Sequence, residues 1–186
     1  NDAAAAKLYR RMLERDPGRR SWLDAFELEL KLHGADHADR LLAFLQDKAT
    51  SVAVRAAVDG LVAQRNGRAD DAIAGYEKSL AADPDQPRLR RFLFDDYIQV
   101  GRLADARAIA ESTERKVAEG NGALRSDAAE MWTALNEPDR AVEGWELLRL
   151  AAPAVPYYAV EEAAARFALC EPDEAIDILE EQIAAA

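Results

Sequence analysis

A short pattern of a small residue, an aromatic residue and a proline recurs along this chain at almost constant intervals. In its clearest copies, an alanine is followed four residues later by an aromatic side chain and twelve residues later by a proline. The clear copies are Ala5/Tyr9/Pro17, Ala72/Tyr76/Pro84 and Ala141/Trp145/Pro153, and weaker ones begin at Ala38, Ala106 and Ala175. Successive alanines are therefore 33, 34, 34, 35 and 34 residues apart. A period of this length indicates an array of stacked supersecondary units.

The segments between these copies have the apolar periodicity of helices rather than strands. In residues 88–100, for example, Leu89 and Leu93 lie near one stripe of a helix. All seven prolines fall at inferred helix boundaries, and no segment alternates like a half-buried strand. Glycines that allow a left-handed turn precede three of the alanine-bearing segments, at Gly34, Gly67 and Gly101. We therefore predict an all-α chain of short antiparallel helix pairs.

Helix pairs with this period and this order of residues resemble the tetratricopeptide repeat, and the resemblance covers essentially the whole chain. It implies a right-handed superhelical solenoid, as a single domain over residues 1–186. The implied elements are a leading helix at 3–16 and helix pairs at about 20–49, 53–84, 87–119, 122–152 and 156–186. The first half of the repeat motif is poorly kept, because Arg90 and Arg125 stand where an aromatic residue is expected. Since the chain opens inside a second helix, we expect it to be a fragment of a longer bacterial protein.

The charge of the chain argues against some classes of partner. The formal net charge is −11, and residues 120–186 contain 4 basic and 14 acidic side chains, so nearly all of the excess lies there. A polyanion would be repelled by this region, so nucleic-acid binding is not expected. No apolar run approaches the roughly 20 residues that a membrane-spanning helix needs, so insertion of this segment is not expected either.

No group of residues predicts catalysis, a cofactor or a metal site. His33 and His37 are four residues apart, but Gly34 interrupts the helix between them and no third ligand is near in sequence. Cys170 lies in an expected turn among acidic neighbours, which disfavour a reactive thiolate. The sequence lacks the common nucleotide-binding, nucleophile-elbow and zinc-protease motifs. We therefore expect a non-enzymatic protein.

The resemblance implies a binding groove along the first helices of the repeats. In tetratricopeptide arrays these helices line a concave surface, on which peptides or partner helices lie. Carried over residue by residue, the groove residues are Gln64, Arg65, Arg88, Arg91, Phe92, Asp95, Asp127, Glu130, Tyr157 and Glu161. Arg88, Arg90 and Arg91 with Phe92 form the most attractive anchor, because arginine and aromatic side chains dominate binding hot spots.

These observations favour a protein–protein interaction scaffold that binds a peptide or partner helix in its groove. Two alternatives remain open: a structural segment of a bacterial envelope machine, such as one for exopolysaccharide export, and a regulatory region attached to an enzyme domain elsewhere. The expected compartment is the bacterial cytoplasm or periplasm, with a lean toward the envelope. The ends of the solenoid offer a further contact, self-association.

Overall fold

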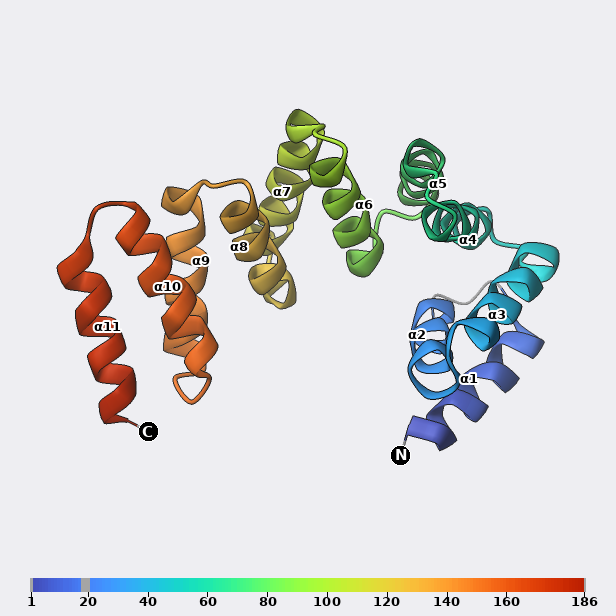
Figure 1. Cartoon of the computed structure of the whole chain (residues 1–186), viewed down its shortest axis with the longest axis horizontal. Coiled ribbons are helices and arrows are strands. Elements are labelled where there is room, and N and C mark those ends of the chain that lie inside the picture. The colour runs from blue at the N-terminus through green and yellow to red at the C-terminus, as the bar shows by residue number, and fades with distance from the viewer. Residues whose placement is uncertain (1, 18–20, 186) are drawn as a thin grey trace. The chain divides into compact units, whose positions relative to one another are not determined.

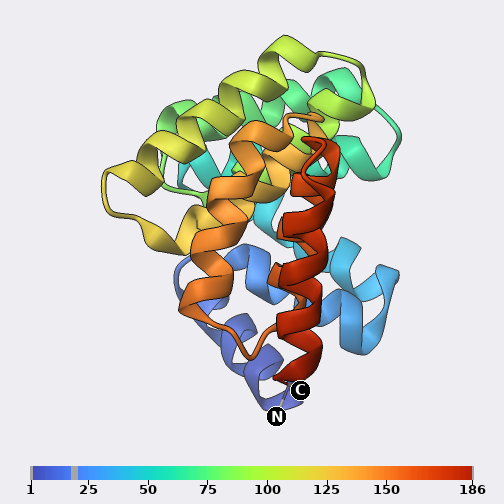
Figure 2. The same cartoon turned by 90° about the vertical axis from the view of Figure 1, so that its left-hand side faces the viewer.

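The computed structural model describes residues 2–17 and 21–185, and these are helical almost throughout (Figures 1 and 2). The helices are α1 (Asp2–Arg15), α2 (Trp22–His33), α3 (Ala35–Lys48), α4 (Val52–Arg65), α5 (Ala69–Ala82), α6 (Pro87–Gln99), α7 (Leu103–Ala118), α8 (Arg125–Ala134), α9 (Pro138–Ala151), α10 (Pro156–Ala168) and α11 (Pro172–Ala184). A short 3-10 turn, η1 (Gly122–Leu124), precedes α8. No strand occurs in the described ranges.

The helices form two compact units, Asn1–Asp96 and Tyr97–Ala186, and the boundary falls inside α6. Within the first unit, α4 and α5 have the most extensive contact, and α1 packs on α2 and α2 on α3. Within the second unit, α8 packs on α9, α9 on α10, and α10 on α11. These helices thus pack on their sequence neighbours. The single array over residues 1–186 stays a prediction.

In four of the helix pairs, a residue in the left-handed conformation lies in the turn between the two helices of the pair. It is Gly67 between α4 and α5, Gly101 between α6 and α7, Asn136 between α8 and α9, and Cys170 between α10 and α11. Their φ angles lie between 57° and 76°. This conformation is routine for glycine and costly for most other residues, so Cys170 carries local strain that Gly67 and Gly101 avoid. The helices after two of these turns begin with a proline, whose missing N–H needs no partner there.

The helices α4 and α5 approach each other very closely. A β-carbon built on Gly75 would lie 2.6 Å from the Cα atom of Gly60 and 2.8 Å from the carbonyl oxygen of Ala56. One on Gly60 would lie 2.8 Å from the ring of Tyr76, which is fully buried. The buried Ser79 Oγ donates a 2.8 Å hydrogen bond to the carbonyl of Ala53, across the same joint. Two glycines facing each other therefore allow α4 and α5 to pack backbone against backbone.

The core of the second unit combines tryptophans with a buried ion pair. Trp145 is completely buried, and its indole N–H donates a 3.1 Å hydrogen bond to Thr133 Oγ1 of α8. The carboxylate of Glu162 on α10 is also completely buried. It accepts hydrogen bonds of 2.6 Å from Arg149 Nε on α9 and 3.1 Å from Arg166 Nε on its own helix. This carboxylate joins α9 to α10, because a buried charge is tolerated only when it is paired.

No helix among the described residues is both long enough and apolar enough to cross a bilayer.

Candidate functional site

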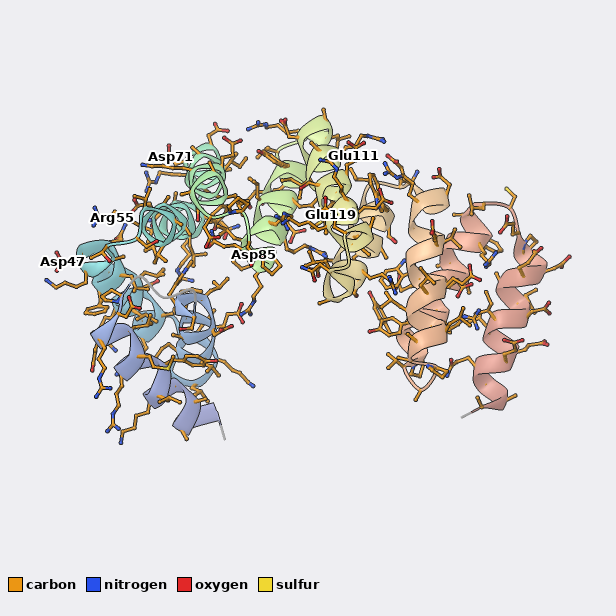
Figure 3. The ribbon with its side chains drawn as sticks, turned by 180° about the vertical axis from the view of Figure 1, so that it is seen from behind. Asp47, Arg55, Asp71, Asp85, Glu111 and Glu119 are labelled. Carbon is orange, nitrogen blue, oxygen red and sulfur yellow. The ribbon has the colours of Figure 1, made fainter. Side chains whose placement is uncertain are left out.

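The first unit contains a cleft between α2 and the start of α6. Two cavities, of about 370 Å³ and about 160 Å³, share Asp24 and Arg88 in their walls. The larger is lined by Tyr9, Asp24, Glu27, Leu28, Lys31 and Arg88. The smaller is lined by Trp22, Leu23, Asp24, Asp85, Gln86, Pro87, Arg88 and Leu89. Asp85 lies in the segment that connects α5 to α6 (Figure 3). We call the two cavities together the α2–α6 cleft.

Arg88 bridges this cleft. It forms ion pairs with Asp24 and with Glu27, which lie three residues apart on α2. All three side chains are a little under half exposed, so the bridge remains in contact with solvent. The bridge brings a predicted groove residue against two carboxylates that the sequence analysis did not select. None of the groove residues predicted from the sequence lies on α2. Asp24, Glu27 and Lys31 nevertheless follow one face of that helix.

Beside Arg88, the predicted anchor on α6 is only partly on the surface. Arg91 Nε lies 3.1 Å from Asp95 Oδ1 in an exposed i,i+4 pair. The ring of Phe92 packs at 6.2 Å from that of Tyr76 and is half-buried. Arg90, in contrast, is only 6% exposed and donates a 2.7 Å hydrogen bond to the carbonyl of Pro84. The prediction of a three-arginine surface cluster is therefore wrong at Arg90, whose guanidinium closes the α5–α6 connection instead.

The predicted groove residues on α4 have partners within the first unit. Arg65 Nε donates a 2.7 Å hydrogen bond to Asp39 Oδ1, and its guanidinium lies over the ring of Phe26 at 5.8 Å. Gln64 donates a 2.7 Å hydrogen bond to Asp96 Oδ1. The structure thus uses both side chains to join helices of the first unit.

Around Gln64, a buried polar cluster forms with Asp96 and Tyr76. Tyr76 donates a 3.2 Å hydrogen bond to Gln64 Oε1. Asp96 is 3% exposed, and its Oδ2 has no hydrogen-bond partner among the described residues. Burial raises the pKa of Asp96; the hydrogen bond from Gln64 opposes this rise, and the charge of Asp95 adds to it. Burial, and secondarily the charge of Asp96, also raises the pKa of Tyr76.

In the second unit, the remaining predicted residues lie on α8 and α10. Asp127 and Glu130 are half-buried on α8, where Ser126 Oγ donates a 3.4 Å hydrogen bond to Glu130. Tyr157 is 46% exposed and packs edge-on against Trp145, with ring centroids 5.6 Å apart. Glu161 is half-buried on α10. Of these four side chains, that of Tyr157 presents the largest apolar surface to solvent.

The side chains of His33 and His37 lie close together. Their rings are 5.0 Å apart, and His37 Nδ1 is 3.7 Å from Glu29 Oε2. Glu29 is itself engaged by Arg10, at 2.5 Å. Within the described ranges, no group of three histidine, cysteine or acidic side chains has a geometry suited to a metal ion.

One family model matches part of the chain. The family model of the tetratricopeptide repeat matches residues 63–119, which include the end of α4, both glycine turns and α5 to α7. No curated protein matches the sequence.

Several solved structures share the fold over most of the chain. One is MamA, with a TM-score of 0.61 and 15% identity over 85% of this chain and 92% of that one. Another contains the TPR-like repeats of a protein described as a kinesin light chain from Podosopora anserina, with a TM-score of 0.65, 19% identity, and coverage of 90% and 95%. A third is BtubC (BKLC) from P. vanneervenii, with a TM-score of 0.64, 14% identity, and coverage of 97% and 86%. The predicted all-α, tetratricopeptide-like fold class and the resemblance to this family are confirmed.

Proposed function

We propose that this tetratricopeptide-repeat chain is a non-catalytic scaffold that binds a segment of a partner protein, with the α2–α6 cleft as a main contact. The tetratricopeptide fold is consistent with a protein–protein interaction scaffold. The α2–α6 cleft is the observation on which we base the choice of this surface as the binding site. Its larger cavity has the volume of a small side-chain pocket and is open to solvent through half-exposed walls.

The walls of the cleft define the chemistry of the partner segment. Leu28 supplies apolar surface to the larger cavity, which suits an aliphatic or aromatic side chain. The walls of the cleft contain three carboxylates but only two cations. The carboxylates are Asp24, Glu27 and Asp85, and the cations are Lys31 and Arg88. Because Arg88 already pairs with two of these carboxylates, a partner that brings its own lysine or arginine competes with it directly. The proposed segment therefore carries an apolar anchor beside a basic residue.

A peptide-display selection tests this proposal. Random peptides are selected on the wild-type chain, and the affinity of each selected peptide is measured by fluorescence anisotropy. Leu28→Glu places a charge on the apolar wall and should weaken binding by about tenfold or more. The matched control is Leu103→Glu, because Leu103 is 56% exposed at the start of α7 and lines neither cavity.

The selected sequences give a second readout. Binding peptides should share a basic residue next to an apolar one, and replacing that basic residue by glutamate should weaken binding. If Leu28→Glu leaves every selected peptide bound as tightly as Leu103→Glu does, the cleft is not the binding site. If the selection yields no binder at all, the scaffold function at this surface is wrong.

A further inference from the structure

The second unit contains a cavity of about 360 Å³ that is lined by α7, α8 and α9. Figure 1 shows these three helices in succession, and neither the first nor the last helix of the chain contributes to the walls. Four lining residues lie on one face of α8: Arg125, Ala128, Ala129 and Trp132. This face extends about 10 Å at 1.5 Å per residue, so the cavity is a trough along α8. We call it the α7–α9 cavity.

One end of the α7–α9 cavity is held in place by contacts within the second unit. Trp132 is 1% exposed, and the guanidinium carbon of Arg140 lies 3.6 Å from the centroid of its ring. Arg140 in turn forms an ion pair with Glu114 on α7. In the middle of the trough, Ala128 and Gly144 are small and leave the space open. The cavity is therefore formed before any partner binds.

The other end carries a cation without a partner. Arg125 is half-buried at the start of α8 and has no hydrogen bond or ion pair to another described residue. Burial removes part of the water that would solvate its guanidinium, and a carboxylate can replace that water with two parallel hydrogen bonds. Arg140 is less available for this role, because Glu114 already engages it. Arg125 therefore favours a carboxylate at this end of the cavity.

A second unpaired donor belongs to Trp132. Its indole Nε1 is buried and has no hydrogen-bond partner among the described residues, whereas the indole of Trp145 donates to Thr133. A buried indole N–H usually has an acceptor. Arg125 and Trp132 are about 10 Å apart along α8, which is the length of about three extended residues. An extended peptide can therefore place a carboxylate at Arg125 and a carbonyl oxygen near Trp132.

The side walls of the α7–α9 cavity are apolar and open to solvent. Leu147 lines it from α9 and is 41% exposed, and Leu150, three residues further along the same helix, is 62% exposed. Val117 lines it from α7. Pockets for small molecules enclose most of the ligand surface, which an open trough does not do. The occupant that fits is a segment of a larger partner, with an apolar side chain against these walls.

We propose that the α7–α9 cavity binds an extended partner segment in which an aspartate or glutamate lies next to a large apolar residue. Glu143 also lines the cavity but is exposed, so water and salt screen its repulsion of the partner's carboxylate more than they screen the attraction by half-buried Arg125. The segment is opposite in charge to the one proposed for the α2–α6 cleft. Since that cleft lies in the first unit, the two proposals stand on separate residues.

A peptide selection on a chain with an altered α2–α6 cleft tests the proposal. Random peptides are selected on the Leu28→Glu variant, and the affinity of each selected peptide is measured by fluorescence anisotropy. Adding Arg125→Gln removes the cation and should weaken binding by about tenfold or more. The matched control is Arg115→Gln, because Arg115 is exposed on α7, has no ion pair to another described residue and does not line the α7–α9 cavity. Circular dichroism establishes that each variant remains folded.

Changes in the peptide provide a second test that leaves the chain intact. Replacing the peptide's aspartate or glutamate by the corresponding amide should weaken binding as much as Arg125→Gln does. Combining both changes should cost little more than either alone, because both remove the same ion pair. In a two-dimensional proton–nitrogen NMR spectrum, the bound peptide should shift the indole signal of Trp132 and leave that of Trp22 unchanged. The Trp132 signal is identified by its loss in Trp132→Phe.

Other outcomes overturn the proposal. A selection that yields no binder, or only peptides without an acidic residue, shows that the cavity does not bind the proposed segment. Equal affinities for Arg125→Gln and Arg115→Gln exclude Arg125 from the contact. A peptide that depends on Arg125 but leaves the indole signal of Trp132 unchanged binds outside the cavity. Because Leu28→Glu is present throughout, these results are distinct from a failure of the α2–α6 cleft to bind its own segment.

Discussion

Replacing Gly75 by alanine should separate α4 from α5. The added methyl group would lie 2.6 Å from Gly60 Cα and 2.7 Å from Gly60 N, whereas ordinary contacts begin at 3.4 Å. Both sides of this contact are backbone, so no side chain can turn away. The helices must move apart by about 1 Å, and a gap of that size removes a quarter to a half of the dispersion attraction across the joint.

The net effect follows from two opposing terms. Overpacking of this kind costs about 3 kcal/mol, at the upper end of its usual range. Alanine in a helix interior is about 1 kcal/mol more favourable than glycine, which offsets part of that cost. Gly75→Ala should therefore lower the free energy of unfolding of the α4–α5 pair by about 2 kcal/mol. Urea denaturation gives the overall loss, and hydrogen exchange at α4 and α5 amides shows whether it lies at this joint.

Two further substitutions control for the chemistry of the change. Gly122→Ala adds the same methyl group where nothing lies within 4 Å, and should change stability by less than about 0.5 kcal/mol. In Gly144→Ala the one contact of the new methyl group below 3.4 Å is with the β-carbon of Ala129, at 2.9 Å, so Ala129→Gly in the same chain should recover its loss. If Gly75→Ala is as mild as Gly122→Ala, the reasoning about backbone contact is refuted.

Three other substitutions, one of them with a matched control, test strain, buried charge and pH dependence. Cys170→Gly removes a side chain from a left-handed turn residue, with a φ of 63°, and should raise the free energy of unfolding by about 0.5–1 kcal/mol in thermal melting. Glu162→Ala leaves two arginines without their buried carboxylate and should cost about 3 kcal/mol. Glu161→Ala, one residue earlier and half-buried, should cost far less in the same denaturation assay. Because the folded chain holds the proton on Asp96 to a higher pH than the unfolded chain does, stability should fall as pH rises from the ordinary pKa of 3.8 through the raised one, and then level off. Asp96→Asn should abolish that fall, so the variant's denaturation midpoint should exceed that of wild type by a margin that grows with pH over this window.

The period of small residues was enough to predict the fold class. The alanines that set it are buried at the helix joints: Ala72, Ala106 and Ala141 are completely buried, and Ala175 is 4% exposed. Their burial follows from local spacing alone, because one small residue per repeat is needed wherever paired helices cross. The close joint between α4 and α5, however, depends on Gly60 facing Gly75. Neither glycine stands out in a sequence until the rotation of both helices is known.

The candidate site was harder to predict, because it depends on contacts between distant residues. Arg88 is chosen correctly as a surface residue, yet its partners Asp24 and Glu27 lie more than 60 residues earlier. Arg90, two residues along, has the same chemistry and is buried. Two residues two positions apart on a helix point to nearly opposite sides. When the rotation of a helix is uncertain, a buried residue such as Arg90 is therefore easily assigned to the surface. Whether the ten selected residues bind a partner stays a prediction.

The joints between neighbouring helices differ in their chemistry, and this makes the repeats non-interchangeable. Paired glycines and Ser79 join α4 to α5, a hydrogen bond from Trp145 to Thr133 joins α8 to α9, and the Glu162 carboxylate joins α9 to α10. A helix docked in the wrong place would leave one of these polar groups buried without its partner. Chains of similar repeats are prone to misassembly during folding. The energetic cost of a buried polar group without its partner disfavours such misassembled states. Removing one repeat from the middle should therefore yield a poorly joined chain rather than a shorter version of the same array.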